Sequence, residues 1–166
     1  MESRAKLFGH PIHQMLIVFP LGLLGMAVIF DIIRLLFGMS ALGPASFYMI
    51  AAGVITGLLA AIFGLVDWLA IPSGTRAKAV GLWHAVGNVV VVLLFALSWW
   101  LRTLDPANPS MTAFVLSLVG LGLSLVTAWL GGELVDRLGV GVDDGANLDA
   151  PSSLSGRPAG GRATAV

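Results

Sequence analysis

The chain has 166 residues, of which 57% are hydrophobic and only 11% are charged, and its formal net charge is zero. Soluble globular domains carry about a quarter charged residues, so this composition excludes a soluble fold, which could not cover so much apolar surface. No basic cluster supports nucleic-acid binding, and the lack of cysteine excludes disulfides, thiolate metal sites, iron–sulfur clusters and covalently attached c-type haem.

Four apolar segments dominate the sequence, at roughly residues 15–37, 47–71, 83–101 and 112–130. Each is close to the ~20 residues that a helix needs to cross the hydrocarbon core of a bilayer. Short loops rich in Gly and Pro separate them, which favours antiparallel neighbours. We therefore predict an all-α integral membrane protein, an up-down four-helix bundle with short loops, whose transmembrane domain covers residues 1–142. The predicted helices are at about 13–37, 46–71, 78–101 and 111–131.

The first predicted helix follows two basic residues, as a secretory signal peptide does. Its apolar part is longer than a signal core, and Asp31 and Arg34 follow where a cleavage site would be expected, so we predict a retained helix. Because Asp31 and Arg34 are three residues apart, we expect a local ion pair between them.

Small residues in the second predicted helix recur at positions 53, 57, 60 and 64, and the next step along this line is Asp67. Such a stripe lets helix backbones approach closely, and it places Asp67 on the packed side of the helix. We expect Asp67 to pair with Arg76 or Lys78, or to accept a hydrogen bond from His84. The fourth predicted helix also carries a stripe of small residues. Whether such a stripe on the outside of the bundle supports a homodimer is left open.

The third predicted helix places His84 and Asn88 four residues apart, hence on one side. After residue 142 the composition changes to Gly, Ala, Ser, Pro, Asp and Arg without apolar periodicity. Such a segment cannot bury enough apolar surface to offset its ordering entropy. We predict that residues 143–166 form a disordered cytoplasmic tail.

An up-down bundle brings the start of the first helix to the same end as the end of the second, the start of the third and the end of the fourth. We call this the histidine end, because all three histidines of the chain fall there. It also holds most of the basic residues: Arg4, Lys6, Arg76, Lys78 and Arg137, with Arg157 and Arg162 in the tail. The positive-inside rule then predicts a multi-pass protein of the bacterial cytoplasmic (inner) membrane with both termini in the cytoplasm.

Six polar residues are expected to gather at the histidine end: His10, His13, Asp67, His84, Asn88 and Glu133. Ionisable side chains at membrane depth are costly and tend to face the interior of a bundle. Imidazoles are ligands for haem iron and for divalent metals, so His10, His13 and His84 are candidate ligands of a b-type haem or a divalent metal. Asp67, Asn88 and Glu133 would orient these ligands. The alternative is that these residues are interfacial groups and braces of the helix ends.

Several short motifs in order resemble a known bacterial family, the membrane domain of unknown function two-two-three-one. They are GHPIH at 9–13, FPLG at 19–22, GLVDW at 64–68, WHA at 83–85 with Asn88, and GGELV at 131–135 followed by GVGV at 139–142. The resemblance covers roughly residues 7–142. It implies a four-helix membrane protein without an assigned activity, and the occurrence of relatives beside or fused to Rieske-type redox domains implies a redox protein partner. The chain departs from the family pattern at Gln14, Asp136 and Leu138, and the last change removes one potential histidine ligand.

Three functions remain open at this point. The first is a haem- or metal-binding membrane module with a redox-associated role. The second is a non-catalytic scaffold or assembly subunit whose polar cluster clasps the helix ends. The third is a small transporter or proton relay, which the scarcity of polar residues along the spans supports poorly. No serine elbow, phosphate-binding loop or HExxH motif occurs, so we expect no independent enzymatic activity.

Overall fold

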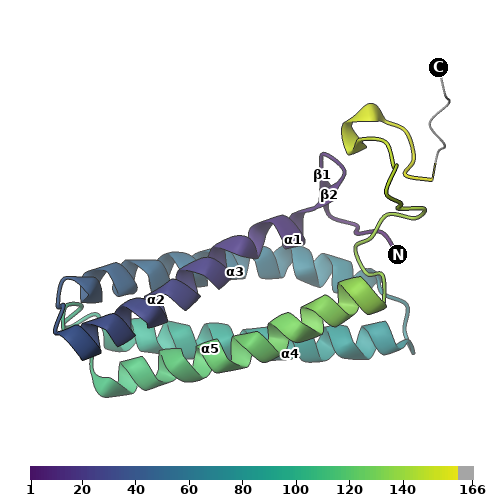
Figure 1. The fold of residues 1–166 in the computed structure, drawn as a ribbon. Helices are drawn as coiled ribbons and strands as arrows, with labels where there is room; N and C mark the ends of the chain where they lie inside the picture. The colour runs from purple at the N-terminus through teal and green to yellow at the C-terminus, as the bar shows by residue number, and fades with distance from the viewer. Residues whose placement is uncertain (161–166) are drawn as a thin grey trace.

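The computed structural model describes residues 1–160 and contains the four long antiparallel helices expected from the sequence (Figure 1). All four are long and apolar enough to cross a membrane. The elements are β1 (Lys6–Leu7), β2 (His10–Pro11), α1 (Ile12–Leu16), α2 (Val18–Phe37), α3 (Leu42–Ala70), α4 (Arg76–Leu101), α5 (Met111–Gly132), the π-helical turn η1 (Glu133–Arg137) and the 3-10 turn η2 (Ser153–Ser155).

The first span is interrupted at Ile17, where α1 ends and α2 begins. Pro20 has no N–H group to donate to the carbonyl four residues earlier, so the hydrogen-bond ladder of the helix is broken there. α3 begins at Leu42, four residues ahead of the predicted start. Pro44 lies in its first turn, where a missing N–H is tolerated. The fourth span continues beyond α5 into η1, so it reaches Arg137.

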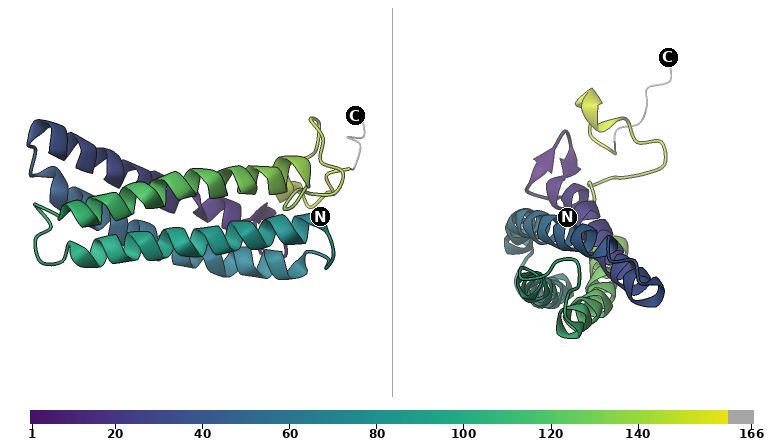
Figure 2. Two further views of the ribbon diagram at one scale, coloured as in Figure 1. Left: turned by 90° about the horizontal axis from the view of Figure 1, so that it is seen from below. Right: turned by 90° about the vertical axis from the view of Figure 1, so that its left-hand side faces the viewer.

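Two helical hairpins make up the bundle. α2 packs along α3 and α4 packs along α5, while α3 lies beside α4 and α2 beside α5 (Figure 2). The first span and α4 are therefore diagonal partners across the bundle. Glycines allow the close approach within each hairpin. A Cβ on Gly53 would lie 2.6 Å from Leu24, and one on Gly120 would lie 2.8 Å from Phe95.

The bundle core is a small apolar cluster made by α2, α3 and α4: Leu24, Ala27, Val28, Ile50, Val54, Val91 and Phe95. Most other large apolar side chains of the helices face outward, including Leu58 and Leu93, at 54% and 62% exposure. A soluble protein would bury such residues, whereas a protein in hydrocarbon gains by presenting them to lipid. The outward apolar surface thus fits the membrane-spanning architecture.

The N-terminal segment and the tail lie together at the histidine end. The two strands form a small hairpin, and residues 143–160 form turns and η2, with no α-helix in this part. The predicted disorder of residues 143–166 stays a prediction, and residues 161–166 lie outside the described part of the chain.

Candidate functional site

Two histidines face each other across the diagonal of the bundle. His13 lies in α1 and His84 lies in α4, and their ring centroids are 6.3 Å apart with the ring planes at 82°. Both side chains are half-buried. The up-down threading predicted from the sequence therefore brings together two of the three candidate ligands, which are 71 positions apart in the chain.

Each of these imidazoles is held by a backbone carbonyl of the neighbouring helix. His13 Nδ1 lies 2.8 Å from the Ala60 oxygen, and His84 Nδ1 lies 2.9 Å from the Thr127 oxygen. A carbonyl oxygen can only accept, so each Nδ1 carries a proton and the lone pair of a neutral ring is on Nε2. This is the arrangement by which proteins fix the tautomer of a metal-binding histidine.

Asn88 completes the surroundings of His84. Its Nδ2 donates to the His84 carbonyl oxygen at 2.9 Å and lies 3.2 Å from His84 Nε2, and its Oδ1 accepts from Thr127 Oγ1 at 3.0 Å. These contacts orient the amide so that an N–H faces the imidazole. Within residues 1–160, His13 Nε2 has no such partner, so the two rings differ in how accessible their lone pairs are.

The glycines of the predicted packing stripes make room for both rings. A Cβ on Gly64 would lie 2.8 Å from His13 Nδ1, and a Cβ on Gly131 would lie 3.1 Å from His84 Cε1. His13 is thus backed by α3 and His84 by α5. Any side chain at either glycine would displace an imidazole.

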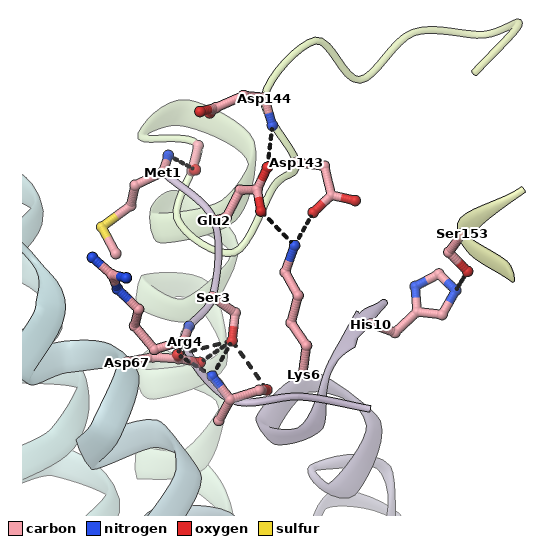
Figure 3. A network of polar contacts seen from close by, with 12 residues as sticks. Met1, Glu2, Ser3, Arg4, Lys6, His10, Asp67, Asp143, Asp144 and Ser153 are labelled. Atoms are coloured by element: carbon pink, nitrogen blue, oxygen red, sulfur yellow. Dashed lines mark hydrogen bonds and ion pairs between the residues drawn. The ribbon is translucent and has the colours of Figure 1, made fainter. Parts of the chain in front are cut away.

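Asp67 binds the N-terminal segment instead of the partners expected for it. Its carboxylate accepts from Ser3 Oγ at 2.8 Å, from the Arg4 amide at 2.7 Å and from the Ala5 amide at 3.3 Å (Figure 3). Ser3 is only 6% exposed. Asp67 therefore closes the end of the bundle, and in this structure it makes no hydrogen bond with His84.

The basic residues proposed as partners of Asp67 are engaged elsewhere. Arg76 forms an ion pair with Glu133 at 2.6 Å, which links the start of α4 to η1. Lys78 Nζ donates to the Trp68 carbonyl oxygen at 2.7 Å and lies 4.0 Å from the centroid of the Trp68 ring. Glu133 thus braces two helix ends and does not contact the histidines.

His10 lies apart from the other two histidines, on the N-terminal hairpin. Its Nε2 is 3.4 Å from Ser153 Oγ of the tail, and the side chain is exposed (Figure 3). Within residues 1–160 there is no group of three or more His, Cys, Asp or Glu side chains that could hold a metal ion. Of the six expected residues, the structure brings together His13, His84 and Asn88.

Lys6 connects the N-terminal segment to the tail. Its Nζ contacts Glu2 at 2.7 Å and Asp143 at 2.5 Å (Figure 3). Hydrogen bonds to Asp143 and Glu2 raise the pKa of Lys6, and the hydrogen bond from Lys6 lowers the pKa of Glu2. The Met1 amine also donates to the Gly139 oxygen at 2.8 Å. Several polar contacts thus hold the two chain segments together over the histidine end.

A second polar cluster lies at the opposite end of the bundle, which we call the ion-pair end. Arg102 donates to both carboxylate oxygens of Asp31, at 3.0 and 2.6 Å, and both side chains are fully buried. Arg102 also contacts Ser98 Oγ and Ser117 Oγ, each at 3.2 Å. The expected local pair between Asp31 and Arg34 was wrong, because Asp31 points across the bundle to α4.

The sequence carried a signal for this cluster. Ser98 is four residues before Arg102, so both side chains lie on one side of the helix, and Ser117 belongs to the stripe of small residues at positions 117, 120, 124, 127 and 131 of the fourth span. The Asp31–Arg102 pairing itself depends on the rotation of α2 relative to α4, which no local spacing encodes.

Comparison with known families identifies one match. The family described as "Predicted membrane protein (DUF2231)" matches residues 9–144. No curated protein and no solved structure matches the chain. The matched range contains all four spans and all six candidate site residues: His10, His13, Asp67, His84, Asn88 and Glu133.

Proposed function

The chain belongs to the DUF2231 family of predicted membrane proteins, and we propose that it is a membrane module that binds haem or a divalent metal between His13 and His84. The proposal includes the bacterial inner membrane as its location, with both termini in the cytoplasm, because the basic residues cluster at the histidine end. A redox-associated role, with a redox protein as partner, is the part of the proposal that rests on family resemblance alone.

The facing pair of imidazoles is the observation that supports this function. Two imidazoles bonded to one metal through nitrogens at about 2.0–2.1 Å have ring centroids roughly 5 to 6.4 Å apart, depending on the angle between the two metal–nitrogen bonds. The observed 6.3 Å between His13 and His84 is close to this separation. Both Nδ1 atoms are bound to carbonyl oxygens, so Nε2 is the ligand atom on each ring; His13 Nε2 has no hydrogen-bond partner within residues 1–160, and His84 Nε2 faces the Asn88 amide at 3.2 Å.

The number of available ligands favours haem over a divalent metal. A structural zinc site uses four protein ligands and a catalytic one uses three. Within residues 1–160 no such group of His, Cys, Asp or Glu is present. A bound haem would need fewer protein ligands, because the porphyrin itself supplies most of the nitrogens around the iron. His13 and His84, on diagonal helices, are the residues that would hold a b-type haem.

The test is the absorption spectrum and metal content of detergent-purified protein, expressed with haem precursor and divalent metals supplied. We expect a Soret band or stoichiometric metal that is lost in His13→Ala and in His84→Ala. His10→Ala is the matched control and should keep the signal, because His10 contacts the tail and not the pair. A wild-type protein with neither haem nor metal would overturn the proposal.

A scaffold role is the second candidate, and the contacts of Asp67 and Glu133 favour it. Asp67 binds the N-terminal segment and Glu133 binds Arg76, so both carboxylates brace chain ends. A pure clasp predicts that His84→Ala and Asp67→Ala both lower thermal stability while no cofactor is present at all. The spectrum of the wild-type protein therefore separates the two functions.

A further inference from the structure

The N-terminal hairpin has an unusual residue in its turn. β1 and β2 pair with Lys6 opposite Pro11 and Leu7 opposite His10, so Phe8 and Gly9 are the two turn residues. Both have positive φ, 51° and 86°. Such turns favour Asn-Gly, and Phe is poorly suited to this backbone conformation. Strain of this kind persists where the side chain has a use elsewhere.

The side chains around this turn are apolar and exposed. Leu7 is 46% exposed and Phe8 is 72% exposed. The tail adds Leu154, at 76% exposure, because η2 packs on the turn: a Cβ on Gly9 would lie 2.7 Å from Ser153 Cβ. Leu7, Phe8 and Leu154, from two chain segments, thus form one small exposed apolar surface, which we call the platform.

The hairpin and η2 lie to one side of the bundle, next to the start of α1, and not beyond the ends of the long helices (Figure 1). The hairpin directly precedes Ile12, where the first span begins. α3 has 29 residues and is about 43 Å long, whereas the hydrocarbon core is about 30 Å thick. The last turns of the long helices therefore reach the headgroup layer, and a segment beside these turns is at the same depth.

We propose that Leu7, Phe8 and Leu154 form an interfacial anchor, which rests in the headgroup layer of the same bilayer that the four helices span. Aromatic rings favour this layer, and apolar side chains that would be costly in water enter its acyl boundary. The exposed Arg4, two residues before β1, adds attraction to anionic headgroups. The occupant of the platform is thus lipid, and the anchor is independent of any cofactor bound at His13 and His84.

The absence of cysteine makes the anchor directly testable by spin labelling. A label on Leu7→Cys, in vesicles of phosphatidylethanolamine and phosphatidylglycerol, is compared for its accessibility to oxygen and to a water-soluble nickel chelate. Leu93→Cys provides the lipid reference, because Leu93 faces outward about two thirds of the way along α4, and Asp149→Cys in the tail provides the aqueous reference. We expect the Leu7 label to be more oxygen-accessible than the Asp149 label and less so than the Leu93 label.

Phe8→Asn removes the aromatic ring and keeps the turn, because Asn adopts the positive φ that this turn requires. We expect the Leu7 label to become several-fold more accessible to the nickel chelate in this background, and a label on Leu154→Cys to follow. A Leu7 label as exposed to nickel as Asp149 in the native background would overturn the anchor. Dipolar broadening between Leu7 labels of two molecules would also overturn it, because the platform would then contact a second copy.

Discussion

The two ends of the bundle hold their polar groups in different ways. At the ion-pair end, Asp31 and Arg102 are fully buried and satisfy each other, with Ser98 and Ser117 as further partners. At the histidine end, two half-buried imidazoles are each held through Nδ1, and His84 Nε2 also lies 3.2 Å from Asn88 Nδ2. Both clusters join the first span to α4 across the diagonal. The difference shows that every charged group of one diagonal contact is satisfied, whereas the other leaves His13 Nε2 without a hydrogen-bond partner within residues 1–160.

The largest effect should come from breaking the Asp31–Arg102 contact. Arg102→Ala leaves the Asp31 carboxylate buried without its partner, which costs about 3–5 kcal/mol in the free energy of unfolding. Unfolding in mixed micelles by titration with dodecyl sulfate measures this loss. Arg34→Ala is the control and should not lower stability comparably, because Arg34 makes no ion pair within residues 1–160 and its Nε is buried without a hydrogen-bond partner.

The stability lost by removing one charge should be recovered by removing the other as well. Replacing both charges, in the double variant Asp31→Leu with Arg102→Met, should recover most of the lost stability, because paired burial of charge is often no better than apolar packing. If Arg102→Ala alone were as stable as the native protein, the interpretation of this end as a mutually satisfied buried ion pair would be refuted.

An intermediate loss of stability is expected at the histidine end when the contacts between Asp67 and the N-terminal segment are removed and the histidines are kept. Asp67→Ala removes the acceptor of Ser3 Oγ and of the Arg4 and Ala5 amides, which should cost about 1–3 kcal/mol. Hydrogen exchange of the Arg4 and Ala5 amides should accelerate, whereas exchange at the ion-pair end should not. Unchanged protection of these two amides would show that Asp67 does not hold the segment.

The smallest effect concerns the link between Lys6 and the tail. The pKa of Glu2 is lowered from its usual 4.5, so its contribution is present above about pH 4.5 and is lost as the pH falls through the lower folded value. The pKa of Lys6 is raised from 10.5, so its contribution is complete below that pH and is lost as the pH rises through the higher folded value. Between these limits the link should not depend on pH.

Amide exchange of Asp144, which donates to Glu2, reports on this link. Exchange corrected for its intrinsic pH dependence should rise below about pH 4.5, and Lys6→Gln should raise it at neutral pH while the bundle keeps its stability. A Lys6→Gln protein with native protection of Asp144 would show that the ion pairs contribute nothing to the contact.

The sequence was sufficient for the architecture, because a run of apolar residues of bilayer length has few alternatives in structure. It was also sufficient for the meeting of His13 and His84, which follows from antiparallel threading and from glycines that leave room for the rings. It could not predict the partners of Asp67, since Ser3 lies 64 positions away in an irregular segment. The predicted partner of Asp31 was also wrong. The spacing of three residues indicated Arg34, whereas the rotation of α2 directs the Asp31 carboxylate to Arg102.

The diagonal placement of Asp31 and Arg102 also constrains how the protein is assembled during biosynthesis. The α2–α3 hairpin contributes the carboxylate alone, and the α4–α5 hairpin contributes the guanidinium together with Ser98 and Ser117. Until both hairpins have been inserted, Asp31 is an uncompensated charge in the membrane. The half-made protein would therefore be recognisable to membrane quality-control proteases, and insertion of α4 would be the step that ends this vulnerability.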